Sequence, residues 1–190
     1  MSAVYQSAFS AKEMFPDKDI TVIDSRTCCL GQGFMVLAAA DALAKGASRH
    51  EAVATAEDVR QRTYLFAALS TLKYLAMSGR VGHLAAGLAG MLEVKPILTI
   101  IDGKLQLLER IRTQHKSWAR VVELALEASA GRKIERMVLL HVSASEAARE
   151  FEPMVREALP CQDVMYAAMN PGLSVHTGAG LIGVVFTTEK

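Results

Sequence analysis

Hydrophobic and polar residues recur along this chain with two different periods, and these periods predict an order of helices and strands. Apolar residues at helical spacing predict helices at about 3–15, 34–45, 49–60, 71–78, 81–92, 114–130 and 145–160. Short apolar runs between polar or glycine residues predict strands at about 20–23, 64–69, 97–101, 105–111, 134–142, 163–169 and 183–186. Strands and helices alternate, and Asp102-Gly103 joins one antiparallel pair, so the pattern indicates an α/β fold.

The character of the sequence changes near residue 62, which predicts two parts. We interpret residues 1–61 as a truncated wound α/β first domain and residues 62–190 as a second α/β domain with a mixed sheet. In the first part, a loop that contains Gly31-Gln32-Gly33 is expected to lead into the helix at 34–45. It lacks the third glycine of a dinucleotide-binding fingerprint, so nucleotide binding is not favoured. Cys28-Cys29 has no assignable basic partner, which favours packing over a nucleophilic role.

The predicted helix at 81–92 has an unusual pattern of side-chain sizes. Val81, Ala85 and Leu88 lie on its apolar stripe, while several glycines and alanines remove bulk from the same helix. Each interior glycine costs about 1 kcal/mol of helix propensity relative to alanine, so something must approach this helix closely. The neighbour is either another helix or sheet, which is the commoner case, or a thin apolar ligand in a slot.

Composition narrows the function classes. The 190 residues include 21 Lys+Arg and 20 Asp+Glu, a formal net charge of +1, with no long run of either sign. This balance argues against broad electrostatic binding to nucleic acid or to an anionic membrane. Hydrophobic residues make up 51% of the chain, but glycine or charge interrupts each apolar run before the roughly 20 residues needed to span a bilayer.

Localisation and metal binding follow from the chain start and the cysteines. No apolar leader with a positively charged start opens the sequence, so we expect a cytoplasmic protein. The three cysteines have no metal-ligand spacing, and their odd number suits a reducing compartment. Neither a metal site nor a cofactor is predicted.

The most suggestive polar stretch is the predicted loop at 174–180, which contains His176-Thr177-Gly178. A neutral histidine and a hydroxyl offer hydrogen-bond donors, and glycine lets backbone amides approach a small anion. Such a set suits a carboxylate. The commoner alternative is a histidine that bonds within its own loop.

Three stretches resemble the DegV family of bacterial fatty-acid-binding proteins. They are SAVYQSAFSAKEMFPDKDITVIDSRTCCLGQGF from Ser2, SGRVGHLAAGLAGMLEVKPILTIIDGKLQLLERIR from Ser78, and NPGLSVHTGAGLIGVVF from Asn170. Together they cover nearly the whole chain in the family's order. Family members usually carry a further segment before the first stretch, so the resemblance implies that the first domain here is shortened.

The resemblance implies a carrier that presents a long-chain fatty acid to a separate ATP-dependent fatty-acid kinase, which forms an acyl-phosphate. In the family, the histidine that matches His176 is associated with the carboxylate. Ser2 matches the serine of a Ser-Gly-Thr head-group loop, but Ala3 and Val4 replace its glycine and threonine. The acyl tail is expected along the helix at 81–92.

Two arginines are candidate contacts with the kinase. Arg112 resembles a family position implicated in that contact, and its alternative is a solvated charge at a strand end. Arg80 lies in the turn before the small-residue helix, where capping of the preceding helix is the favoured alternative. Neighbouring basic residues form a modest cluster that suits a soluble face or an acidic partner.

Two other functions stay open from the sequence. The shortened chain could be a non-binding fragment or an interaction module, with an uncovered apolar face closed in a homodimer. A hydrolase that uses His176 as a base is less favoured, because no GxSxG nucleophile accompanies it.

Overall fold

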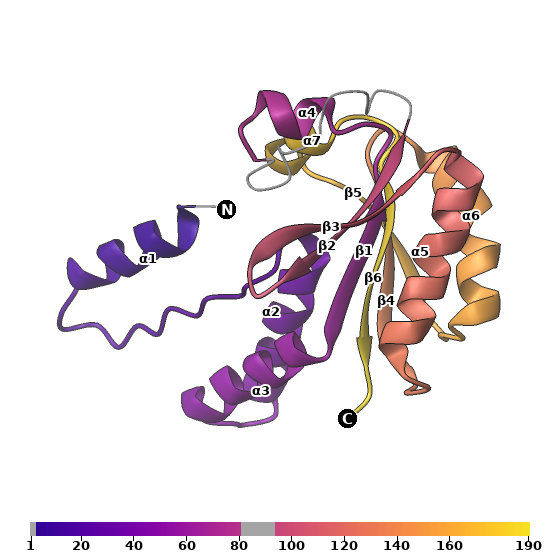
Figure 1. Cartoon of the computed structure of the whole chain (residues 1–190). Helices are drawn as coiled ribbons and strands as arrows, with labels where there is room; N and C mark the ends of the chain where they lie inside the picture. Colours follow the sequence, from indigo (N-terminus) through magenta and orange to yellow (C-terminus); the bar gives the residue numbers. More distant parts are fainter. Residues whose placement is uncertain (1–2, 81–93) are drawn as a thin grey trace.

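The chain forms a mixed sheet with helices on both faces (Figure 1). The computed structural model describes residues 3–80 and 94–190. Within these ranges the sheet has six strands in the order β3-β2-β1-β6-β4-β5. The strands are β1 (Thr63–Ala68), β2 (Lys95–Ile101), β3 (Lys104–Ile111), β4 (Ile134–His141), β5 (Val164–Ala168) and β6 (Ile182–Thr188). The helices are α1 (Val4–Glu13), α2 (Cys29–Ala44), α3 (Arg49–Gln61), α4 (Lys73–Met77), α5 (Gln114–Ser129), α6 (Ser145–Ala158) and α7 (Pro171–Thr177).

The last strand of the chain, β6, lies in the middle of the sheet. It pairs antiparallel with β1 on one side and with β4 on the other, and all seven of its residues are buried. A strand that is buried on both faces is expected to be a nearly continuous apolar run. The sequence therefore predicts only the apolar stretch 183–186, whereas β6 also includes the polar residues Thr187 and Thr188. The parallel pair is β4 and β5, so the predicted α/β class with a mixed sheet is confirmed.

Alternate residues of the central strands feed two separate cores. On β1, Phe66 and Ala68 face a core that α5 and α6 complete with Trp118 and Phe151. Leu65 and Ala67 belong to the other core, together with residues of α2 and α3. This division follows from the two-residue period of a strand. Because α2 and α3 precede residue 62, both predicted parts pack on one sheet, and the domain boundary there stays a prediction.

The first segment departs from the sequence prediction in two places. Residues 20–23 form no strand; instead an extended run leads from α1 towards α2 (Figure 1). An apolar run becomes a strand only where a neighbour supplies its hydrogen bonds, and the edges of the sheet are β3 and β5. The predicted loop at 31–33 is also wrong, because α2 already begins at Cys29. Gly31 packs so closely that a Cβ there would lie 2.7 Å from the Thr27 hydroxyl oxygen.

The predictions that rest on contacts between residues close together in the sequence are confirmed. Ser48 caps α3 in a capping box: its hydroxyl accepts from the Glu51 amide at 3.3 Å, and its own amide donates to the Glu51 carboxylate at 2.8 Å. The predicted strand pair, the helices at 114–130 and 145–160, and the strands at 134–142 and 163–169 all form within a few residues of their expected bounds. The predicted helix at 81–92 lies outside the described residues.

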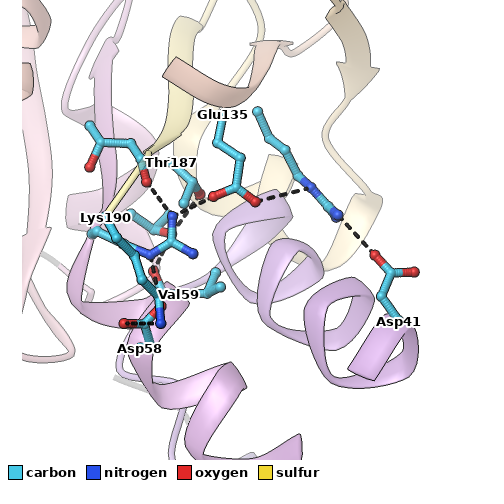
Figure 2. A network of polar contacts seen from close by, with 10 residues as sticks. Asp41, Asp58, Val59, Glu135, Thr187 and Lys190 are labelled. Carbon is cyan, nitrogen blue, oxygen red and sulfur yellow. Dashed lines mark hydrogen bonds and ion pairs between the residues drawn. The ribbon is translucent and has the colours of Figure 1, made fainter. Parts of the chain in front are cut away.

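A polar network centred on Arg62 joins α3 to the end of the sheet (Figure 2). The Arg62 Nε donates to the Asp58 carboxylate at 2.8 Å, and its Nη1 donates to the Glu135 carboxylate and to the Thr188 carbonyl. Lys190 lies 3.4 Å from Asp58. The Arg62 side chain is only 13% exposed, so its partners offset the cost of removing the charge from water. The network ties the C-terminal strand β6 to β4 and to α3.

We expect Arg62→Met to lower the free energy of unfolding by about 2 kcal/mol, because it leaves two carboxylates without their shared partner. Urea unfolding followed by circular dichroism measures this change. Arg156→Met is the matched control: Arg156 pairs with Glu152 within α6 and is 43% exposed, so it should cost at most about 0.5 kcal/mol. Equal losses in both variants would contradict a special role for Arg62.

The same network predicts a dependence of stability on pH. Burial alone would raise the pKa of Asp58, but the hydrogen bond and charge of Arg62, with Lys190, lower it below its usual value. A carboxylate with a lowered folded pKa stabilises the protein above its unfolded pKa of about 3.9 and loses this effect as the pH falls. Below about pH 4 the wild-type chain should therefore lose more stability than Arg62→Met.

Candidate functional site

A cavity of about 1010 Å³ lies over the face of the sheet that α2 partly covers. Its floor is apolar and comes from alternate strand residues that face the same side, which are Leu65, Ala67, Leu98, Ile100 and Leu140. Its walls come from α1, from the segment at 22–30, from the β2–β3 hairpin and from α7. The cavity therefore combines an apolar floor with polar side chains around part of its wall.

The helix α7 brings two predicted site residues to this cavity. Asn170 caps it by accepting a hydrogen bond from the Leu173 amide at 3.1 Å, and Pro171 occupies its first turn. The prediction of a loop at 174–180 is therefore wrong in its first half, since His176 and Thr177 form the last turn of α7. Asn followed by Pro is a common start of a helix, and this signal could have revealed it. Both His176 and Thr177 line the cavity.

His176 carries an unusual polar atom. Its Nδ1 is buried, and no hydrogen-bond partner for it is present among the described residues. A buried polar group without a partner costs about 1–3 kcal/mol, so native structures rarely leave one unpaired. Thr177 differs, because its hydroxyl donates to the Leu173 carbonyl at 3.4 Å. Within the described part of the chain, then, the Nδ1 of His176 has no hydrogen-bond partner, and because this atom is buried, a ligand atom in the cavity can reach it only after the ring or its neighbours shift.

The turn after His176 requires glycine. Gly178 is buried, with φ 77° and ψ 166°, a backbone region that other residues almost never adopt. A Cβ at this position would lie 2.2 Å from the ring of Tyr74 in α4. At Gly180 a Cβ would lie 2.2 Å from the Ser70 hydroxyl oxygen. The close packing of this turn on α4 and the end of β1 fixes where α7 holds His176.

The two candidate arginines lie apart. Arg80 lines the cavity, and its guanidinium donates to the carbonyl of Ser78, the residue that ends α4, at 2.6 Å. This contact confirms the capping interaction that the sequence favours. Arg112 lies exposed just beyond β3 and outside the cavity lining, and no ion pair to it is present among the described residues. Whether either arginine contacts a partner stays a prediction.

The remaining predicted ligand-binding residues are Ser2, Val81, Ala85 and Leu88, which lie outside the described residues. Sequence reasoning missed Arg26, which lines the cavity from the segment before α2. Arg26 lies 3.8 Å from Asp102 in the β2–β3 hairpin, and a Cβ on Gly103 would meet its backbone at 3.4 Å. These contacts between distant segments leave no local signal. They bring the hairpin against the cavity wall.

Two adjacent cysteines also line the cavity. Cys28 is the N-cap residue of α2 and Cys29 its first residue, and their Sγ atoms are 3.4 Å apart. The hydrogen bond with Cys29 lowers the pKa of Cys28, whereas this bond and burial raise the pKa of Cys29. Both side chains pack against the core, as the sequence analysis favours.

Two classes of site have no support within the described ranges 3–80 and 94–190. They contain no group of three or more His, Cys, Asp or Glu side chains arranged to hold a metal ion. None of their helices is long and apolar enough to cross a membrane.

Comparison with known proteins identifies the family. A model of the DegV family, described as uncharacterised proteins, matches residues 1–189. The chain belongs to the DegV family. Among curated DegV proteins, it is 34% identical over 186 residues to the DegV domain-containing protein Rv2417c of Mycobacterium tuberculosis. That alignment covers 97% of this chain and 65% of the relative, so the chain spans about two thirds of the length of such relatives.

Solved DegV structures have the same fold. The DegV family protein Cg2579 of Corynebacterium glutamicum matches all of this chain, and 72% of its own, with a TM-score of 0.92 and 28% identity. A Thermus thermophilus DegV protein, whose structure is described as binding fatty acid, matches 99% of this chain and 67% of its own at a TM-score of 0.87 and 29% identity. DegV of Bacillus subtilis, described as a fatty-acid-binding protein, matches 99% of this chain and 67% of its own, with a TM-score of 0.83 and 27% identity. The predicted resemblance is confirmed.

We expect Gly178→Ala to lower the free energy of unfolding by about 3 kcal/mol, through the positive φ and the clash with Tyr74. Urea unfolding measures the loss. Gly131→Ala is the control, because Gly131 also has a positive φ of 74° but a Cβ there meets nothing within 4 Å. It should cost about 1 kcal/mol.

A double-mutant cycle with Tyr74→Ala separates the clash from the backbone strain. If the ring causes part of the loss, Tyr74→Ala should recover at least about 1 kcal/mol of it in the Gly178→Ala background. Additive losses would show that α4 does not constrain the turn.

Proposed function

We propose that this DegV protein is a carrier that binds one long-chain fatty acid in the cavity, with the carboxylate at His176 and the acyl tail over the apolar floor. The observation that carries the proposal is the buried, unpaired Nδ1 of His176 at the wall of a cavity with an apolar floor. Fatty-acid binding by DegV proteins of Thermus thermophilus and Bacillus subtilis supports the same ligand class.

The size and chemistry of the cavity suit such a ligand. Sites for drug-sized molecules enclose about 300–1,000 Å³, and this cavity lies at the upper end of that range. Each buried methylene contributes about 0.8 kcal/mol, so a long chain binds well even after the cost of ordering it. At the other end of the ligand, a neutral imidazole can donate from Nδ1 to a carboxylate oxygen. Arg80 adds positive charge to the cavity wall, whereas Arg26 lies beside Asp24 and Asp102, which line the same cavity.

The carrier itself performs no reaction in this proposal. A separate ATP-dependent fatty-acid kinase in the cytoplasm would phosphorylate the bound carboxylate, which requires the head group to lie near the surface. Val175, the neighbour of His176, is 61% exposed. We propose that Arg112 and Arg80 contact this kinase. Arg112 suits this role because it is exposed just after the edge strand β3, and the basic residues close to it in sequence, Arg110, His115 and Lys116, are exposed as well.

An alternative is that residues 1–190 are a non-binding fragment or interaction module. The observation that favours it is the exposed apolar surface of α2, where Val36, Leu37 and Leu43 are 61%, 45% and 51% exposed. A homodimer could cover this surface. Native mass spectrometry tests both functions, because one spectrum reports the bound ligand and the number of chains.

We expect the protein purified from bacteria to carry one long-chain fatty acid per chain, identified by native mass spectrometry and organic extraction. His176→Ala should weaken binding of the extracted acid by about 10- to 100-fold, since it removes a hydrogen bond to a charged group. His50→Ala is the matched control, because His50 is exposed on α3. Ile100→Trp should also weaken binding by filling the apolar floor.

A folded, monodisperse protein that carries no fatty acid and does not bind added acid would contradict the carrier proposal. If the acid binds but His176→Ala and His50→Ala have equal affinities, the carboxylate does not lie at His176. If Ile100→Trp binds as tightly as the wild type, the tail does not lie over this part of the sheet.

For the kinase contact, we expect Arg112→Glu to slow acyl-phosphate formation by about tenfold, because charge reversal at an interface weakens association. The loaded carrier is mixed with a fatty-acid kinase and ATP, and the product is trapped with hydroxylamine. Arg149→Glu, which changes an exposed arginine of α6, is the control. Equal rates in both variants, with unchanged fatty-acid affinity, would remove Arg112 from the contact.

A further inference from the structure

The adjacent cysteines at the start of α2 are not used by the carrier function, although both line the cavity. Their Sγ atoms lie 3.4 Å apart, and both thiols are free. We propose that Cys28 and Cys29 form a peroxide-sensitive dithiol in the cavity wall, in which Cys28 is the attacking thiol and Cys29 the resolving thiol.

The position of Cys28 favours a reactive thiolate. It is the N-cap residue of α2, a helix of 16 residues whose aligned peptide dipoles place partial positive charge at this end. The Cys28 side chain makes no capping hydrogen bond to the first amides of α2, so the helix dipole alone favours its thiolate at this position. The hydrogen bond with Cys29 also lowers the pKa of Cys28, which again favours the thiolate. Both side chains are partly exposed, so a small oxidant reaches them through the cavity.

The position of Cys29 favours the second step. Redox-sensitive cysteines usually combine a reactive, accessible thiolate with a resolving cysteine beside it. The gap of 3.4 Å must close to a bond of about 2.05 Å, and because the two cysteines are adjacent, this bond closes a strained eight-membered ring. The N-cap position of Cys28 assigns the first attack to this thiol, and the raised pKa of Cys29, caused by the hydrogen bond with Cys28 and by burial, agrees with it.

The reaction balances with hydrogen peroxide as the oxidant. The Cys28 thiolate attacks one oxygen, the O–O bond breaks, and the leaving hydroxide takes a proton to form water, which leaves a sulfenic acid on Cys28. The Cys29 sulfur then attacks the Cys28 sulfur and forms the disulfide, while its proton leaves with the displaced hydroxide as a second water. Two thiols lose two electrons and one peroxide becomes two waters.

The resulting bond should be easily reversed. Adjacent Cα atoms are about 3.8 Å apart, shorter than the usual 4.4–6.8 Å across a disulfide. Strained disulfides are more readily reduced than structural ones. The pair is therefore suited to reversible oxidation in the cavity wall and not to a permanent cross-link.

The third cysteine provides an internal control. Cys161 packs beside the opposite core, and burial raises its pKa, so its thiol is less reactive. Its Sγ contacts the carbonyl of Asp163 at 3.4 Å. Cys161→Ser should therefore leave the reaction of the pair unchanged.

The experiment treats the whole protein with one equivalent of hydrogen peroxide and follows free thiols and intact mass. We expect the wild type and Cys161→Ser each to lose two thiols and the mass of two hydrogen atoms, with full recovery after dithiothreitol. Cys29→Ser should instead accumulate a sulfenic acid on Cys28 that dimedone traps, and Cys28→Ser should react at least about tenfold more slowly.

Peptide mapping of the oxidised wild type tests the proposal without any variant, because it locates the cross-link directly. A Cys28–Cys29 bond within one chain is the expected result. Oxidation mainly at Cys161, disulfide-linked dimers, or equal rates in Cys28→Ser and the wild type would each overturn the proposal. These readouts do not involve fatty acid, so they stay separate from the test of the carrier function.

Discussion

Burial of β6 between β1 and β4 is the constraint on which the rest of the structure depends. Strand β6 follows the other five strands in the sequence, so the sheet has no centre until β6 has paired with β1 and β4. The same strand positions the site: α7 connects the end of β5 to the start of β6, and the Gly180 amide donates to the Val142 carbonyl at 2.8 Å just beyond β4. His176 thus lies on the segment between β5 and β6, and each of these strands pairs with β4. The packing that stabilises the fold therefore also orients the cavity wall.

The two faces of the sheet are packed differently. Ala67 of β1 pairs with Gly183 of β6, and a Cβ on Gly183 would lie 2.8 Å from the Ala67 Cβ and from the Phe66 carbonyl oxygen. On the opposite face, Phe186, Phe151 and Trp118 fill the space under α5 and α6. Large aromatic residues close one core, whereas the other face carries the cavity over Leu65, Ala67 and their neighbours. One face of the sheet therefore carries a closed aromatic core, and the other face carries the cavity.

The sequence predicted the elements whose signals are local and missed those that depend on distant contacts. The Ser48 capping box, the hairpin at Asp102-Gly103 and the long amphipathic helix α5 are visible within a few residues of sequence. The run at 20–23 has the composition of a strand but no partner strand, and sequence alone cannot supply that information. His176 was selected for its chemistry and through the family resemblance. Its unpaired Nδ1, and the proximity of Arg26 to the same cavity, exist only after distant segments have packed.

A carrier needs affinity and release, and the two ends of the proposed site serve these needs differently. Apolar burial accumulates with each methylene and does not depend on direction, so the floor of strand side chains provides affinity for many chain lengths. In the proposed carrier the head group would rely on a hydrogen bond from His176, in the last turn of a seven-residue helix whose residues are all at least partly exposed. Short, exposed elements open at a lower free-energy cost than a central strand. In the proposed carrier, opening at α7 would uncover the carboxylate and leave the tail on the sheet.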